Sequence, residues 1–321
     1  MTDILMHYMR HASSFAATWM MSWFVLYMLI WCVYPALRRF LMNLHPATAS
    51  SAVLALLLLP FLTSLVATAL VFTPILEKNV ITTHYHSADC ENRFPLLKSG
   101  MAIGGVLIMT ALCLTLLLRK FFSQLLFSRK LEAKLAILGE KQAEWCVLPH
   151  KEPLVFTMGW LNNTIFITEG LLRQCDPRDV EIILGHEREH VRRKDNLRLL
   201  AGKLLMLIMP SFLAKKMWED LQLFTEAACD FSTAAKHGPL NVAETLLRIE
   251  RLSPQKFCFF SKTMVSAFTG SEVEGRVMLL LEGNTSAKAR RFRPVLYLIV
   301  LLALSVLLVD PLHHGVEWLL R

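Results

Sequence analysis

The sequence predicts an α-helical polytopic membrane protein with four spans, in which a mainly helical α+β domain lies between the third and fourth spans. Two observations carry this prediction. Hydrophobic residues make up 54% of the 321 residues and charged residues only 19%, with a mean hydropathy of +0.44. That is more apolar surface than one soluble core buries. The apolar residues also gather into long charge-free stretches, whereas the charged residues gather between them.

The first three spans are predicted at residues 12–37, 52–73 and 99–118, all of them free of charge. The first stretch is too long for the apolar core of a cleaved signal and has no small-residue cleavage site before charge returns. It is therefore a retained span. Pro60 interrupts the second stretch.

The fourth span is predicted within 294–321, where residues 294–309 are uncharged and a short tail follows. At 1.5 Å per residue this stretch reaches only ~24 Å, short of a ~30 Å hydrocarbon core, although Pro311 and Leu312 extend it. The apolar run Leu204–Ala214 is shorter still and lies between Lys203 and Lys215. We interpret that run as buried or interfacial.

Basic residues orient the spans. Four spans place both termini on one side, and the segments 38–51 and 119–293 together hold 29 basic and 20 acidic residues, a net charge of +9. The remainder carries −1. The positive-inside rule then predicts that the domain is cytoplasmic and both termini are outside. Direct nucleic-acid binding is not expected, because the basic clusters are not interleaved with aromatic residues on one face.

The cytoplasmic domain, residues 119–293, begins with a helix predicted over Lys130–Trp145. A β-hairpin is predicted over Pro153–Thr168, where two apolar runs flank the polar pair Asn162-Asn163. The rest is helical in pattern, with breaks near Pro210, Gly238-Pro239 and Ser253-Pro254.

One predicted helix carries a metal-binding motif. Asp176-Pro177 marks its start, and His186-Glu187-Arg188-Glu189-His190 is an HExxH segment. Residues four apart on a helix differ by only ~40° and ~6 Å, so both imidazoles face one ion. Glu187 is placed to act as a general base on a water beside that ion. The alternative is a solvated helix face.

A second helical segment supplies a candidate for the third metal ligand, which the motif lacks. Glu226 and Asp230 are four residues apart, 36 residues after His190. Catalytic zinc has three protein ligands and one open position, so we expect one Zn²⁺ ion bound by His186, His190 and Glu226. Asp230 is expected to orient a ligating imidazole. Cys229, turned by ~100° from its neighbours, is expected to be a buried structural thiol.

Other side chains are weaker candidates. His237 or Arg276 is a candidate oxyanion donor, against ordinary surface or packing roles. The free edge of the Asn163–Thr168 hairpin is a candidate for binding an extended substrate, against simple packing. His84 and His86 in the outer loop between the second and third spans are candidates for metal binding or pH sensing, against solvated loop histidines.

Three segments resemble a known family. The run Glu181–Leu197, EIILGHEREHVRRKDNL, is similar to the zinc helix of the BlaR/MecR antirepressor metalloproteases, and Glu226–Asp230, EAACD, resembles their third-ligand helix. Phe156–Leu172 resembles the preceding strand, and three spans before the domain and one after also match. The resemblance implies a cytoplasm-facing gluzincin endopeptidase of the bacterial inner membrane, with His186, His190 and Glu226 as ligands and Glu187 as base.

The chain departs from that family after the fourth span, where it lacks the penicillin-binding sensor domain, so β-lactam acylation is not implied. The expected function is a zinc endopeptidase cleaving a cytoplasmic protein, with a transcriptional repressor as the substrate that the resemblance suggests. The alternatives are an HtpX-like quality-control protease and a non-catalytic transducer that holds zinc for folding. HtpX places spans between HExxH and Glu-x-x-x-Asp, and Leu204–Ala214 is too short for that. The expected partners are the bilayer and a protein substrate, and the oligomeric state stays open between monomer and homodimer.

Overall fold

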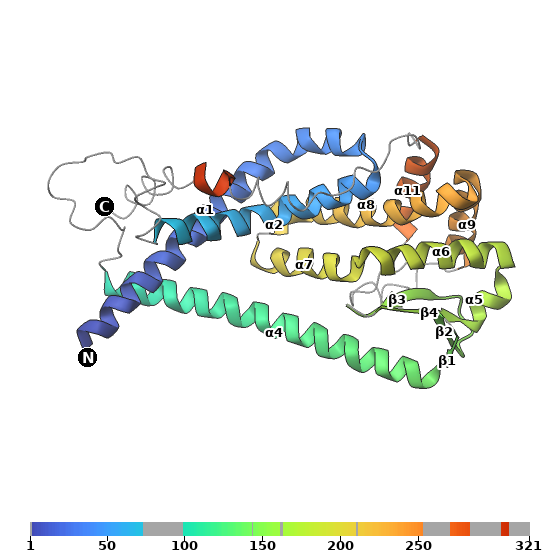
Figure 1. The fold of residues 1–321 in the computed structure, drawn as a ribbon, viewed down its shortest axis with the longest axis horizontal. Coiled ribbons are helices and arrows are strands. Elements are labelled where there is room, and N and C mark those ends of the chain that lie inside the picture. Colours follow the sequence, from blue (N-terminus) through green and yellow to red (C-terminus); the bar gives the residue numbers. More distant parts are fainter. Residues whose placement is uncertain are drawn as a thin grey trace. The chain divides into compact units, whose positions relative to one another are not determined.

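The computed structural model describes residues 2–72, 99–142, 144–160, 163–209, 211–252, 270–282 and 303–307. Figure 1 shows the helices and strands in their order along the chain. The chain divides into two compact units. Unit 1 comprises Met1–Ala36, Ala55–Leu117 and Phe292–Arg321, and unit 2 comprises Leu37–Leu54 and Leu118–Arg291.

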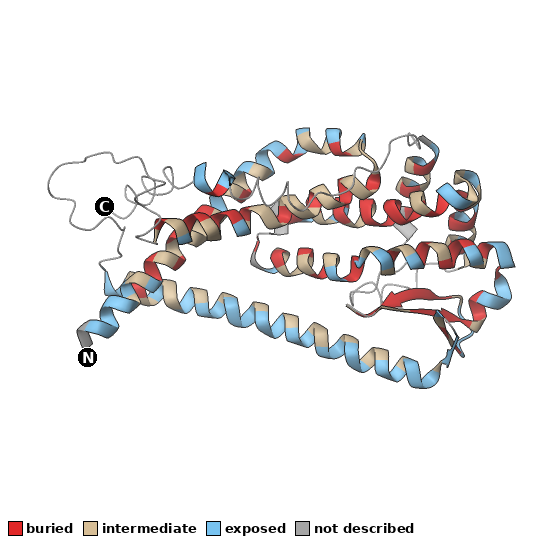
Figure 2. Ribbon diagram, in the orientation of Figure 1, coloured by how far each residue is buried: buried red, intermediate tan, exposed pale blue. Residues whose placement is uncertain are grey.

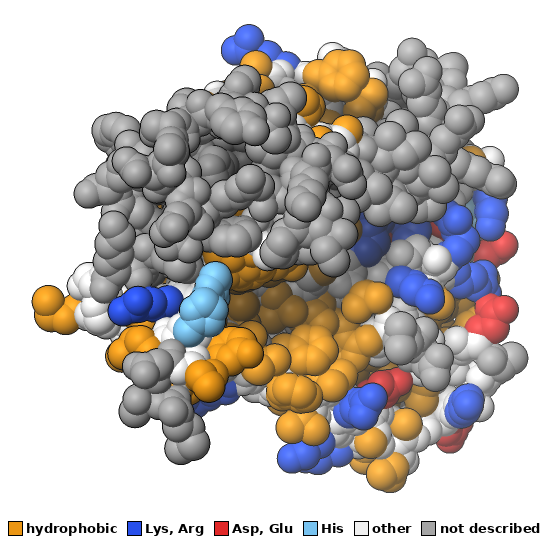
Figure 3. Space-filling model, turned by 60° about the vertical axis from the view of Figure 1, so that its left-hand side comes forward, with side chains coloured by type: hydrophobic (Ala, Val, Ile, Leu, Met, Phe, Trp, Pro, Cys, Tyr) orange, Lys and Arg blue, Asp and Glu red, His pale blue; other side chains and the backbone are white. Residues whose placement is uncertain are grey.

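Three long apolar helices cover the first three predicted spans to within two residues at the ends of those spans. They are α1 (Thr2–Met42), α2 (Pro46–Val71) and α4 (Gly100–Leu138), and each is long and apolar enough to cross a membrane. Apolar side chains of α4, including Ile108, Leu112 and Leu116, are more than half exposed, and hydrophobic side chains gather on the face in Figure 3. A bilayer would cover such a surface. Most of the predicted fourth span lies outside the described residues, of which 303–307 form one helical turn.

Unit 2 contains a four-stranded sheet. The strands β1 (Glu140–Lys141), β2 (Trp145–Leu148), β3 (Val155–Met158) and β4 (Thr164–Thr168) lie in the order β1-β2-β4-β3. The antiparallel pair β3–β4 confirms the predicted hairpin, and β2 pairs in parallel with β4. Since β4 lies inside the sheet, the free edge of the hairpin within the described residues is β3.

The helix predicted over Lys130–Trp145 is wrong at its end, because α4 stops at Leu138 and Trp145 begins β2. Gly139 explains the break. A Cβ atom there would lie 2.3 Å from Cys146 Sγ, so the chain needs glycine to turn back this tightly.

Helices form the rest of unit 2: α5 (Glu169–Gln174), α6 (Pro177–Arg193), α7 (Asp195–Ile208), α8 (Ser211–His237), α9 (Pro239–Leu252) and α11 (Gly270–Glu282). All three predicted breaks coincide with helix ends. Helix α6 is central and buried along much of its length (Figure 2). Ile183 and Leu184 pack with the sheet, and Ile182 packs with residues of α8, α9 and α11. The sheet and α8 therefore hold α6 from two sides.

The turn between α1 and α2 belongs to unit 2. Arg38 near the end of α1 donates from Nε to the buried carboxylate of Asp220 at 2.7 Å. Within the described residues after the HExxH motif, α7 is 14 residues long, about 21 Å at 1.5 Å per residue. No helix between the motif and Glu226 in that part of the chain is a candidate span, in line with the interpretation of Leu204–Ala214.

Candidate metal centre

The HExxH segment occupies the second half of α6. Pro177 begins the helix, where its missing N–H and fixed φ suit the first turn. Ile183 on the apolar face anchors the helix beneath the sheet. His186, Glu187 and His190 are 3%, 1% and 2% exposed, so all three polar side chains are held inside unit 2.

The two imidazoles meet Glu226 at one point. His186 Nε2 lies 3.0 Å from His190 Nε2. From α8, the carboxylate of Glu226 lies 3.3 Å from His186 Nε2 and 3.5 Å from His190 Nε2. The structure therefore brings together the three side chains expected as ligands, from two helices.

The donor set fits a divalent cation. His186 Nδ1 faces Asp230 at 2.9 Å and His190 Nδ1 faces Asp195 at 3.0 Å. An Nδ1 that donates to a carboxylate leaves Nε2 with a lone pair, so two lone pairs and one carboxylate point at the same spot. The atoms of such a group repel one another unless a proton or a metal cation lies between them. Two nitrogens each ~2.05 Å from a tetrahedral zinc would be ~3.3 Å apart, close to the spacing seen here.

Each histidine has its own orienting carboxylate. Asp230 faces His186, the role predicted for it from the sequence. Asp195, which faces His190, is fully buried and was not predicted. It follows Lys194, whose left-handed backbone (φ of 54°) ends α6 and separates it from α7. Helical spacing therefore gave no signal for it, since it lies five residues from His190 across a kink.

Charges around the centre favour protonated histidines and an ionised glutamate. Burial by itself lowers the pKa of His186, but Asp230 and Glu226 together outweigh burial and the pKa is raised. The pKa of His190 is likewise raised against burial. Burial alone would raise the pKa of Glu226, yet the charge of His190 keeps it well below its usual value. Protons and a divalent cation therefore compete for one site.

The side chain of Glu187 extends from α6 to β3, the edge strand of the sheet. Thr157 of β3 donates from Oγ1 to Glu187 Oε2 at 2.6 Å. Asn196 at the start of α7 donates from Nδ2 to the carbonyl oxygens of Thr157 and Gly159, both at 3.1 Å. The proposed base and the free edge of the sheet are thus held together.

Cys229 also lies within ligand distance of the histidines, because suitable atoms of His186, His190 and Cys229 fall within 4.8 Å of one another. Its sulfur, however, is 3.4 Å from Nδ1 of His190 and 3.6 Å from Asp195 Oδ2. It therefore lies behind the imidazole, away from the paired Nε2 atoms. Burial raises the pKa of the Cys229 thiol to about 12, as expected for an unreactive structural thiol.

Arg276 is near the centre but faces its supporting carboxylates. The side chain is 1% exposed and donates from Nε and an Nη atom to both oxygens of Asp230, each at 2.7 Å. A further Nη atom lies 3.3 Å from Glu226 Oε2. In place of the predicted oxyanion donor, the structure shows an arginine that holds Asp230 and reaches Glu226.

Replacing Arg276 should destabilise the protein strongly. Arg276→Met keeps most of the buried volume but leaves Asp230 as an uncompensated buried charge, a loss of about 3–5 kcal/mol in the free energy of unfolding. Denaturant titration in detergent micelles would measure it. The control is Arg173→Met, which breaks an exposed pair with Glu169 and should cost less than about 1 kcal/mol. Equal losses would contradict the role given to Arg276.

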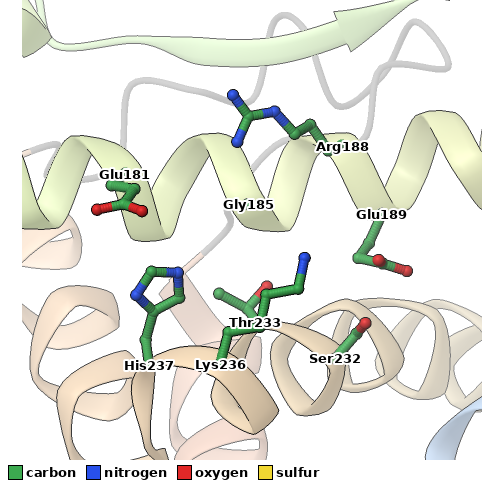
Figure 4. Close-up of a pocket in the computed structure, with 8 residues that line it drawn as sticks. All are labelled: Glu181, Gly185, Arg188, Glu189, Ser232, Thr233, Lys236 and His237. Carbon is green, nitrogen blue, oxygen red and sulfur yellow. The ribbon is translucent and has the colours of Figure 1, made fainter.

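His237, the other predicted oxyanion donor, lies elsewhere. It lines a small polar pocket between α6 and α8, where it points toward Glu181 (Figure 4). The α6 residues of this pocket include Gly185 and Glu189, each one position before a motif histidine and so turned by about 100° from it. The pocket is thus on another face of α6. His84 and His86 lie outside the described residues.

Comparisons with known proteins find similarity to peptidases. The sequence model of peptidase family M48 matches residues 100–279. The Protease HtpX of Nitrosococcus oceani is 29% identical over 119 residues, which cover 36% of this chain and 37% of that protein. The chain thus matches little more than a third of that relative's length.

Proposed function

The chain belongs to peptidase family M48, whose members are zinc metalloproteases, and from this premise we propose that it is an endopeptidase of the bacterial inner membrane that cleaves an extended protein segment on the cytoplasmic side. The convergence of His186, His190 and Glu226 beside Glu187 carries the proposal. Three ligands and a separate base fit a catalytic zinc site, whereas a structural site has four protein ligands.

Each side chain of the site would have its own role in peptide hydrolysis. His186, His190 and Glu226 would hold zinc, which when bound polarises the scissile carbonyl and makes a water more acidic. Glu187 would take the proton from the attacking water and pass it to the leaving amine. Thr157 holds one oxygen of Glu187, which leaves the other to meet that water. Asp195 and Asp230 would keep the imidazoles aligned.

We propose that an extended substrate binds along β3, beside Glu187. Strand β3 is the free edge of the hairpin and lies next to Glu187 through Thr157. Main-chain pairing with a free edge is a common way of binding extended peptides. Asn196 already holds the carbonyls of Thr157 and Gly159, so an incoming segment competes with Asn196 at this end of β3.

Two kinds of substrate fit a protease of this type. The residues shared with antirepressor metalloproteases favour a single cytoplasmic regulator, such as a transcriptional repressor. The similarity to a Protease HtpX favours damaged membrane proteins, the quality-control alternative. Both use the same zinc site and differ in how many proteins are cut.

Mapping of new N-termini tests the proposal. Cells producing the wild-type chain are compared with cells producing Glu187→Gln, and purified protein in liposomes is assayed with zinc on the proteins that differ. Cuts that require Glu187 support the endopeptidase, and their number separates one regulator from many membrane proteins. Identical N-termini in both strains, with no cleavage in liposomes, would contradict it.

A further inference from the structure

Behind the metal centre, Asp195 sits in a buried cluster of charges. Its carboxylate accepts from Arg193 Nε at 3.1 and 3.2 Å and from an Arg198 Nη atom at 3.1 Å, besides facing His190. Asp195 is 0% exposed, and the side chains of Arg193 and Arg198 are 9% and 17% exposed. Two guanidinium groups thus fix the carboxylate that orients His190.

The two arginines share one hydroxyl group of α2. Nη atoms of Arg193 and Arg198 donate to Ser50 Oγ at 3.3 and 3.1 Å, and Arg198 also donates to Ser51 Oγ at 3.1 Å. Guanidinium groups repel each other at such close range, and an acceptor between them offsets the repulsion. Ser50 is fully buried, so bulk water does not offer the two arginines another acceptor at this position.

Ser50 also reaches the helix of the third proposed ligand. Its Oγ lies 3.0 Å from Thr225 Oγ1. Both lone pairs of the Ser50 hydroxyl accept from arginines, so Ser50 donates its proton to Thr225. Thr225 precedes Glu226 on α8. One side chain of α2 therefore links the segment that bears Asp195 to the helix that bears Glu226.

We propose that Ser50 is a positioning residue for the metal centre, which fixes His190 through the two arginines and Asp195. The proposal rests on the ligand role of His190 given above. Ser50 lies in the segment Leu37–Leu54, which joins α1 to α2 and belongs to unit 2 together with the metal centre. This segment would then take part in setting zinc affinity.

Zinc affinity of the full-length chain in detergent micelles tests this, by competition with a chromophoric chelator. Loss of a group that orients a ligating histidine typically weakens metal binding 10- to 100-fold. Ser50→Ala acts two contacts further away, through the arginines and Asp195, so we expect zinc binding weakened by about 3- to 10-fold, together with a changed visible spectrum of the cobalt-loaded protein. The matched control is Ser64→Ala, on the same helix and equally buried, whose hydroxyl bonds only the carbonyl of Phe61 in the contacts seen.

Two further variants make the result specific. Asp195→Asn should weaken zinc binding more than Ser50→Ala, and the double variant should bind no more weakly than Asp195→Asn, because Ser50 acts through Asp195. Ser50→Ala matching Ser64→Ala in affinity and spectrum, or additive losses in the double variant, would overturn the proposal. If Asp195→Asn and His190→Ala both leave zinc affinity unchanged, the ligand assignment itself fails.

Discussion

Glu226→Gln should leave the purified protein with little zinc, whereas Cys229→Ser should keep about one ion per chain. Glu226 offers its carboxylate oxygens at 3.3 and 3.5 Å from the paired Nε2 atoms. The sulfur of Cys229 lies on the Nδ1 side of the His190 ring, where the Asp195 carboxylate also lies. Losing one of three ligands removes a large part of the affinity, and the neutral amide of glutamine is a far weaker donor for zinc.

Metal analysis after gel filtration, with zinc titration of both variants, measures the difference. The two substitutions are three residues apart on α8, so each is a control for damage to the helix by the other. Full zinc content in Glu226→Gln with loss in Cys229→Ser would reverse the assignment and make the thiol the third ligand.

Glu187→Gln should abolish proteolysis with zinc retained. General base catalysis contributes about 10²- to 10⁴-fold to the rate, and the glutamine keeps the size of the side chain and an oxygen for Thr157. Glu187 is not one of the three side chains proposed as zinc ligands, so its replacement should not release the metal. The rate of cleavage of a substrate found by N-terminal mapping, together with zinc content, gives both quantities.

Glu189→Gln is the matched control for that variant. It lies two residues further along α6, in the pocket with His237, and its carboxylate pairs with Arg192 at 2.6 Å. It should retain the wild-type rate. A Glu187→Gln protein that cleaves as fast as Glu189→Gln would show that another group removes the proton from water.

The core of the site could be predicted because its parts repeat at helical spacing. His186 with His190, and Glu226 with Asp230, are each four apart, and zinc chemistry limits which residue types such pairs contain. The hairpin was predictable from two apolar runs around a polar turn. The structure places all of these as expected.

What the sequence could not predict depends on contacts distant along the chain. Asp195 reaches His190 only because the chain kinks at Lys194. Arg276 pairs with a carboxylate 46 residues away, and nothing in its own segment indicates that it is buried. The residues around Arg38 and Ser50 were interpreted only as a cytoplasmic loop that orients the spans, because positive charge beside a span is sufficient for that.

X-ray absorption at the zinc edge of the full-length wild-type protein tests the central assignment most directly. Two imidazole nitrogens and oxygen donors should give a single shell of light atoms at about 2.0–2.2 Å. A sulfur at about 2.3 Å from the metal would contradict the site formed by His186, His190 and Glu226.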